Sequence, residues 1–183
     1  MPNPFQILGL APSFSLDLGE LEQRQRDLNR ALHPDRNTGR PPAERRESLS
    51  RSMDINQAYR VLRDPASRAE ALFELLGVHE VAERTVNDPA LLSAMLEQRE
   101  LLDQARRDKD GARLSTLKRV NDERRLEIER ALGAAFRPLV ASLAEGAAPA
   151  ADRDALDTVR RLYGELKYVR RFGEEVAAIE DET

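Results

Sequence analysis

The sequence contains no cysteine and no tryptophan, and aromatic residues make up only 4% of its 183 residues. Without cysteine the chain can form neither disulfides nor thiolate metal sites, which suits a protein of the reducing cytoplasm. The low aromatic content, together with 34% charged residues, favours long solvated helices with modest cores over a sandwich of β-sheets. We therefore predict an all-α protein.

The sequence also lacks an excess of basic charge and any long apolar run. The 29 Lys and Arg residues stand against 33 Asp and Glu residues, so the formal net charge is −4. This acidic balance disfavours a general nucleic-acid-binding protein. No apolar run approaches the roughly 18 residues that a membrane-spanning helix needs, and the chain begins without the basic and apolar regions of a signal peptide. We expect a soluble, cytoplasmic protein that binds neither nucleic acid nor membrane.

The first 76 residues have the pattern of a helical hairpin flanked by short helices. An apolar cluster between Pro4 and Pro12 predicts a first helix of about two turns. Ser15 or Asp17 can cap a second helix, a third is expected over residues 43–62, and Asp64-Pro65 begins a fourth. The apolar side chains predicted to be buried are Leu18, Leu21, Leu28 and Leu32 in the second helix and Leu49, Met53, Ile55, Tyr59 and Leu62 in the third.

The outer side of the second helix, opposite its leucines, carries Gln23, Arg26 and Arg30. The two arginines make this side locally basic. Pro34 ends this helix, since proline disfavours helical geometry in the residue before it, and His33-Pro34-Asp35 becomes a loop tripeptide. Taken alone, the tripeptide is compatible with a chance combination of a helix cap, a helix stop and a turn residue. Its position between two amphipathic helices, after a short apolar helix, resembles the arrangement of a J-domain.

Residues 88–183 predict three helices that form an antiparallel bundle. The first runs from Asp88-Pro89 to about Arg107, the second follows a turn at residues 109–111, and the third spans roughly residues 153–179. Gly133 and Pro138 lie within the second helix, and the pattern leaves open whether they bend or split it. Residues 77–87 have weak periodicity and are predicted to be a linker, so the expected domains are residues 1–76 and 88–183.

The first helix of the bundle has two distinct apolar sides. At about 100° per residue, one side faces the bundle core and consists of Leu91, Met95, Leu102 and Ala105. The other side is an apolar strip with an acidic margin, made of Leu92, Leu96, Glu97, Glu100 and Asp103. Such a strip either packs against the first domain or is exposed for a partner, and the sequence leaves both open.

Several ordered segments of the N-terminal half resemble the J-domain family. Phe5–Leu10 is similar to the first J-domain helix, and Asn56–Pro65 with Arg68-Ala69 is similar to the end of the third helix and the start of the fourth. The resemblance implies that the loop tripeptide and the basic helix face dock on a DnaK-type chaperone and trigger its ATP hydrolysis. The residues to which it gives this role are His33, Pro34, Asp35, Arg26 and Arg30, with Arg24 and Arg36 as flanking candidates.

Over nearly its whole length the chain is similar to the HscB family, whose members join a J-domain to a three-helix bundle. The similar segments of the bundle are Thr85–Asp103, Leu117–Val120 and Thr158–Leu162. Members of this family help the DnaK-type chaperone HscA act on IscU, the scaffold on which iron-sulfur clusters are assembled. The resemblance implies that the scaffold binds Leu92, Leu96, Glu97, Glu100 and Tyr168. For Tyr168 the helical pattern leaves a second interpretation, in which it is buried together with Phe172.

These observations predict a co-chaperone with no catalytic residues, no metal and no cofactor. His33 is accompanied by neither a metal-binding spacing nor a phosphate-binding glycine loop, and the only other histidine, His79, lies in the predicted linker. Some relatives carry a zinc-binding segment with four cysteines, so a chain without cysteine is similar to the bacterial form. The alternatives are a general J-domain co-chaperone that delivers other clients to DnaK and a purely structural helical adapter. The oligomeric state and the angle between the domains stay undecided.

Overall fold

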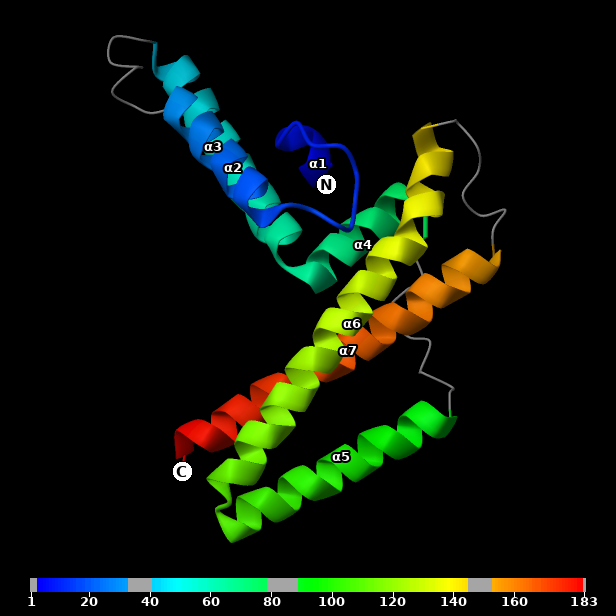
Figure 1. The fold of residues 1–183 in the computed structure, drawn as a ribbon. Helices are drawn as coiled ribbons and strands as arrows, with labels where there is room; N and C mark the ends of the chain where they lie inside the picture. Colours follow the sequence, from blue (N-terminus) through cyan, green and yellow to red (C-terminus); the bar gives the residue numbers. More distant parts are fainter. Residues whose placement is uncertain (1–2, 33–40, 79–88, 145–152, 183) are drawn as a thin grey trace. The chain divides into compact units, whose positions relative to one another are not determined.

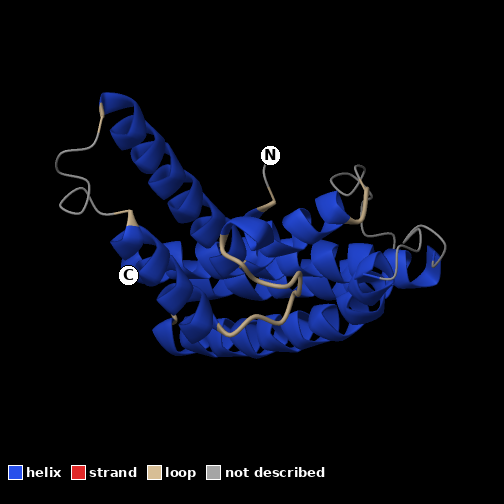
Figure 2. Ribbon diagram, turned by 90° about the horizontal axis from the view of Figure 1, so that it is seen from above, coloured by secondary structure: helices blue, strands red, loops and turns tan. Residues whose placement is uncertain are grey.

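The structure is a computed structural model that describes residues 3–32, 41–78, 89–144 and 153–182. Within these ranges the chain forms helices and their connections without any strand (Figures 1 and 2), which confirms the predicted all-α class. None of the described helices combines the length and the apolar character that crossing a bilayer requires. The helices are α1 (Pro4–Ile7), α2 (Leu18–Ala31), α3 (Pro42–Arg63), α4 (Pro65–Leu75), α5 (Pro89–Asp108), α6 (Gly111–Ala144) and α7 (Arg153–Glu182).

The chain divides into two compact units, each of which combines two separate stretches of the sequence. The first unit consists of Met1–His79 and Arg137–Pro149, and the second consists of Glu80–Phe136 and Ala150–Thr183. Helix α6 runs through Gly133 and Pro138 without interruption and contributes to both units. Gly133 and Pro138 therefore do not split α6.

Helices α1 to α4 form most of the first unit, and local capping chemistry determines where they begin. The Asp17 carboxylate accepts hydrogen bonds from the backbone N–H groups of Gly19 and Glu20, at 2.7 and 3.0 Å, and caps α2. The Asp64 carboxylate accepts one from the N–H of Ser67 at 2.8 Å, and Pro65 occupies the first position of α4. Both caps agree with the sequence pattern, because a side-chain oxygen satisfies backbone donors that lack a partner within the helix.

Helices α2 and α3 lie side by side and antiparallel, and polar side chains join them over part of their length. The Asn56 amide oxygen accepts hydrogen bonds from the side-chain amides of Gln25 and Asn29, at 2.8 and 2.9 Å. The Ser52 hydroxyl donates to the amide oxygen of Asn29 at 2.8 Å. The outer half of this hairpin is therefore held by a polar seam.

The burial expected for three apolar residues of the hairpin is wrong. Leu18, Leu49 and Met53 are 52%, 64% and 65% exposed, whereas Ile55 and Leu62 are buried as predicted. At about 100° per residue, Leu49 and Met53 lie about 120° and 160° from Ile55, so they face away from the core side of α3. The side of α3 that faces α2 is occupied at this level by the polar seam, which leaves both residues at the surface.

One charged side chain ties the segments of the first unit together. Arg68 of α4 is only 6% exposed. Its guanidinium donates to the backbone carbonyls of Leu62, Phe14 and Arg63, at 2.6, 2.7 and 3.2 Å. It also lies over the ring of Phe14, 5.4 Å from the centroid. A single side chain thus holds the loop before α2 and the end of α3 against α4.

The second unit has an apolar cluster that all three of its helices share. Leu102 and Ala105 of α5 are buried, as their place on the predicted core side requires, whereas Leu91 and Met95 are half-buried. The turn expected at residues 109–111 joins α5 to α6, with Lys109 in the left-handed region at a φ of 52°. The buried members of the cluster are Leu102, Ala105, Leu114, Phe172, Val176 and Ile179.

Two buried polar groups lie between α6 and α7. Glu165 is 2% exposed, and its carboxylate accepts hydrogen bonds from Arg161 and, at 2.8 Å, from Arg124. Asn121 is 3% exposed and donates to the carbonyl of Val169 at 2.9 Å. A Cβ at Gly173 would lie 3.0 Å from the Asn121 amide nitrogen, so the glycine makes room for this side chain. The pair of Arg124 and Glu165 fixes how α6 and α7 are aligned, because an unpaired buried charge is costly.

Candidate functional site

The arginine side of α2 is exposed, and each of its charges has a partner on the same helix. Arg26 forms an ion pair with Glu22 at 2.7 Å and donates to the amide oxygen of Gln23 at 3.1 Å. Arg30 lies 3.9 Å from Asp27. Exposed pairs of this kind contribute only about 0–1 kcal/mol. A partner can therefore take over these guanidinium groups at small cost.

Arg24 does not share the side of Arg26 and Arg30. It pairs with Glu20 at 3.3 Å, and a Cβ at Gly9 would lie 3.5 Å from its terminal nitrogen. At about 100° per residue, Arg24 lies about 120° to 160° around α2 from the other two arginines. The structure thus brings Arg26 and Arg30 together and directs Arg24 toward the loop after α1.

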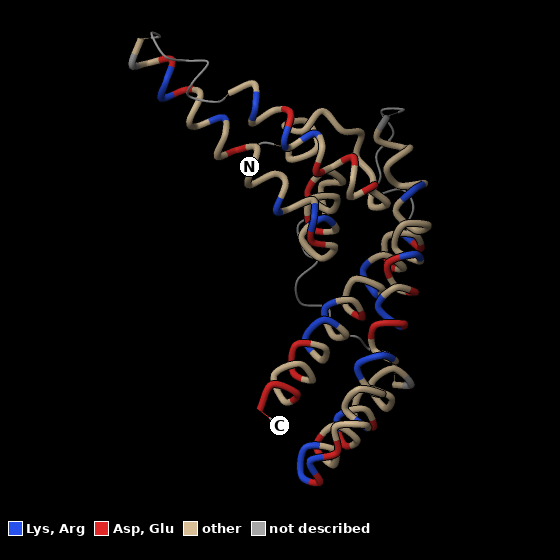
Figure 3. Tube along the Cα trace, turned by 60° about the vertical axis from the view of Figure 1, so that its left-hand side comes forward, with Lys and Arg blue, Asp and Glu red and all other residues tan. Residues whose placement is uncertain are grey.

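Basic and acidic residues are interspersed along the described helices (Figure 3). On α2 they balance in number but are distributed unequally along the helix. Glu20 lies in the first turn and Arg30 in the last turn, which is the order that the helix dipole favours. The positive end of this charge gradient is therefore the end that precedes the loop tripeptide. The remaining predicted residues of this surface, His33, Pro34, Asp35 and Arg36, lie outside the described residues.

The α5 strip (Leu92, Leu96, Glu97, Glu100 and Asp103) is at the surface. Leu92 is 41% exposed and Leu96 is 65% exposed, and the three acidic members are exposed as well. Arg99, next to the strip, lies 3.3 Å from Glu175 and joins α5 to α7. The strip thus combines exposed leucine surface with exposed carboxylates on a helix that an ion pair joins to α7.

Tyr168 takes part in the packing of the bundle. Its hydroxyl donates to the carbonyl of Met95 at 3.0 Å, and its ring stacks on Phe172 with centroids 6.1 Å apart. Burial raises the pKa of the Tyr168 hydroxyl above its ordinary value, while the neighbouring Arg99 acts in the opposite direction. Tyr168 is only half-buried, so part of its ring stays accessible next to α5. The packing interpretation of this residue is therefore observed, and its role as a contact stays a prediction.

Sequence reasoning missed the exposed apolar pair Leu49 and Met53 on α3. The signal was available, because their angular distance from Ile55 placed them outside the core side of the helix. Buried Arg68 was missed for a different reason, since its hydrogen-bond partners Leu62 and Phe14 come from other parts of the chain. The sequence around Arg68 alone does not predict such a contact.

Comparisons with known proteins match both parts of the chain. A family model for the DnaJ domain matches residues 3–71, and one for the HSCB C-terminal oligomerisation domain matches residues 87–177. Curated relatives from Bordetella pertussis and Bordetella parapertussis are each described as a co-chaperone protein HscB homolog. Both are 40% identical over 129 residues, which is 70% of this chain and 75% of theirs.

Solved structures are similar over almost the whole chain. Chaperone HscB from Vibrio cholerae has a TM-score of 0.76 at 26% identity and covers 98% of this chain and 99% of its own. Human co-chaperone protein HscB has a TM-score of 0.76 at 22% identity, with 97% and 82% covered. The Jac1 co-chaperone from Saccharomyces cerevisiae has a TM-score of 0.67 at 23% identity, with 97% and 96% covered. The human and yeast likenesses are likenesses of fold.

Proposed function

Because the chain belongs to the HscB family of J-domain co-chaperones, we propose that it stimulates the ATPase of a DnaK-type, HscA-like chaperone and delivers an IscU-like iron-sulfur cluster scaffold to it. The membership confirms the family predicted from the sequence. With the help of the chaperone, the iron-sulfur cluster on the delivered scaffold would mature or be transferred. The protein itself would supply recognition and no catalytic group.

The chaperone half of the proposal depends mainly on one observation. The DnaJ-domain match spans residues 3–71, and within this range His33-Pro34-Asp35 follows the arginine end of α2 in the sequence and precedes α3. Arg26 and Arg30 would steer the protein toward an acidic chaperone surface. Pro34 would limit the entropy lost on docking, and Asp35 would compete for an arginine of the partner. The half-exposed ion pairs of α2 make this exchange of partners inexpensive.

The scaffold half is supported by the α5 strip. Leu92 and Leu96 offer exposed apolar surface one turn apart, and Glu97 and Glu100 add charge at its margin. An apolar centre with a polar edge is the usual composition of a protein interface. Tyr168 of α7 would contribute the accessible part of its ring. We expect the leucines to provide most of the affinity and the carboxylates to select a scaffold surface that carries basic groups.

Single-turnover ATP hydrolysis by a purified HscA-type chaperone tests both halves with the full-length chain. We expect stimulation by the protein alone and a further increase when an IscU-type scaffold is added. His33→Gln should lower the stimulation at least about tenfold, which corresponds to about 1.4 kcal/mol. The matched control is His79→Gln, which changes the only other histidine. Stimulation unchanged by His33→Gln would contradict the J-domain assignment.

The same assay separates the scaffold surface from the chaperone surface. Leu92→Ala with Leu96→Ala should weaken scaffold binding about tenfold or more, because two apolar contacts are lost, and should spare stimulation without scaffold. Leu101→Ala with Leu126→Ala is the matched control, since these leucines are 39% and 44% exposed and lie outside the strip. Equal scaffold affinity of the strip variant and the control would refute the placement. Stimulation by mixed unfolded clients but not by scaffold would indicate a general co-chaperone.

A further inference from the structure

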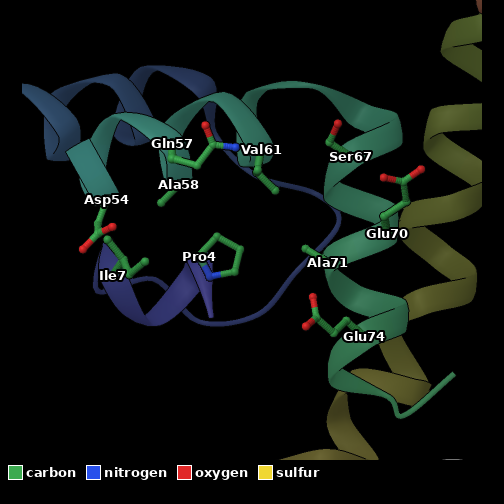
Figure 4. A pocket seen from close by; sticks show the side chains of 10 residues that line it. All are labelled: Pro4, Ile7, Asp54, Gln57, Ala58, Val61, Ser67, Glu70, Ala71 and Glu74. Atoms are coloured by element: carbon green, nitrogen blue, oxygen red, sulfur yellow. The ribbon is translucent and has the colours of Figure 1, made fainter. Parts of the chain in front are cut away.

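A groove with a volume of about 380 Å³ lies in the first unit between α1, α3 and α4 (Figure 4). Its floor is apolar and consists of Pro4, Ile7, Ala58, Val61 and Ala71. The volume is at the lower end of the range for ligand pockets, which is about 300–1,000 Å³. None of the floor residues belongs to the proposed chaperone-binding or scaffold-binding set. The proposed function therefore assigns no role to this groove.

The rim of the groove is acidic. Figure 4 shows Asp54 of α3 at one end and Glu70 and Glu74 of α4 at the other, and all three residues are exposed. No lysine or arginine is among the described residues that line the groove. An apolar floor between carboxylates disfavours anionic occupants, because phosphate groups of nucleic acid or of acidic lipid would be repelled by the rim.

We propose that this groove binds a basic amphipathic helix of a partner protein. Apolar side chains on one side of such a helix would contact the floor formed by residues such as Ile7 and Val61, as in other complexes in which a helix lies in a groove. Lysine or arginine residues at its two ends would pair with Asp54 and with Glu70 and Glu74. The charges give the complex an orientation, and the apolar floor gives it affinity.

The groove and the proposed chaperone surface lie on different sides of α3. Ser52 and Asn56 face α2, as their hydrogen bonds show, whereas Asp54, Ala58 and Val61 line the groove. The partner helix would therefore leave Arg26 and Arg30 of α2 accessible. Binding in the groove is expected to be compatible with stimulation of the chaperone.

The test uses two synthetic helical peptides with the same leucine pattern, one with lysine and one with glutamate at the flanking positions. Amide chemical shifts of the isotope-labelled full-length protein report where each peptide binds. The lysine peptide should shift amides of α1, α4 and the groove side of α3, and its affinity should fall as added salt shortens the screening length. The glutamate peptide should not bind. Equal binding of both peptides would overturn the proposal.

Charge-reversal variants tie the binding to the acidic rim. Asp54→Lys with Glu74→Lys should lower the affinity for the lysine peptide at least about tenfold. Asp27→Lys, which changes an exposed carboxylate of α2 outside the groove, is the matched control and should change it less than about twofold. Asp54→Asn with Glu74→Gln, which remove the charges without reversing them, give an intermediate loss and guard against misfolding of the reversal variant.

The α5 strip is the competing site for such a peptide, because it is also apolar with an acidic margin. Shifts confined to α5 that disappear in the Leu92→Ala, Leu96→Ala variant would overturn the proposal. An unchanged affinity in the rim variants would overturn it as well. Binding to phosphatidylserine vesicles through the rim residues would show that the groove prefers an anionic surface and would contradict the charge argument.

Discussion

Arg68 in the first unit and Glu165 in the second are both charged and both almost completely buried, but their surroundings differ. Arg68 donates to three backbone carbonyls of the loop before α2 and the end of α3. Glu165 accepts from Arg124 and Arg161, whose side chains are each 49% exposed. Backbone carbonyls cannot turn to water when their donor is lost, whereas half-exposed arginines can. The first unit should therefore depend far more on its buried charge than the second.

The proposed binding surfaces of the two units differ in a related way. On α2, the arginines are paired with acidic residues of the same helix until a partner replaces them. On α5, Leu92 and Leu96 offer apolar surface that is 41% and 65% exposed. The first surface should respond strongly to salt and the second only weakly, because screening weakens interactions between charges and leaves apolar contact almost unchanged. The following predictions test this contrast, beginning with the largest effect.

Arg68→Met keeps the apolar stem of the side chain and removes its donors. Two buried carbonyls and one part-buried carbonyl then lose a partner, so the free energy of unfolding of the first unit should fall by about 3–5 kcal/mol. Hydrogen exchange of amides in α1 to α4, compared with those in α5, α7 and residues 111–136 of α6, measures the effect for each unit. Arg63→Met is the control, because Arg63 is exposed and lies 5.9 Å from the ring centroid of Tyr59. Similar protection in both variants would contradict the role given to Arg68.

Glu165→Gln should cost about 1–2 kcal/mol in the second unit, less than a fully buried ion pair, because solvent reaches both arginines. Denaturant unfolding followed by hydrogen exchange in α6 and α7 measures it. Glu174→Gln removes an exposed carboxylate 3.5 Å from Arg170 on the same helix and should have almost no effect. A loss as large as that of Arg68→Met would remove the contrast between the two units.

Arg26→Ala with Arg30→Ala should lower stimulation of the chaperone about tenfold at about 50 mM salt, and by less at about 300 mM. Helical circular dichroism should be unchanged, since the ion pairs that are lost contribute little to stability. Scaffold binding by the same variant should keep both its affinity and its weak salt dependence. Arg24→Ala is the comparison within α2, because Arg24 points away from the other two arginines. A steep salt dependence of scaffold binding would show that charge rather than apolar contact dominates on α5.

Tyr168→Phe should have the smallest effect, a loss of about 1 kcal/mol or less with the hydrogen bond to Met95. The pKa of Tyr168 is raised by burial, so the folded state keeps its proton at a pH where the unfolded chain loses it. The contribution of this hydroxyl is complete below pH about 10 and is lost as the pH rises through the folded pKa. The difference in tyrosinate absorbance between the wild type and the variant should have its midpoint above pH about 10. A midpoint at or below that value would contradict the burial.

Features governed by local chemistry could be predicted from the sequence. The caps at Asp17 and Asp64 and the turn at residues 109–111 follow from short-range patterns, whereas the sequence left open whether Leu92 and Leu96 are packed or exposed, and only the structure shows them exposed. The errors at Leu49 and Met53 could have been avoided, because their angular distance from Ile55 places both residues outside the core side of α3. The partners of Arg68 and Glu165 depend on tertiary contacts up to 54 residues apart. The separation of Arg24 from Arg26 and Arg30 follows from helical geometry.

The division of α6 between the two units affects the order in which the protein can fold during synthesis. Residues 137–149 belong to the first unit although most of that unit precedes residue 80. A nascent chain that has emerged from the ribosome only as far as α4 therefore lacks a part of its first unit, whereas N-terminal domains usually complete themselves early in translation. We expect the first unit to reach its final protection from proteases only after the end of α6 has left the exit tunnel.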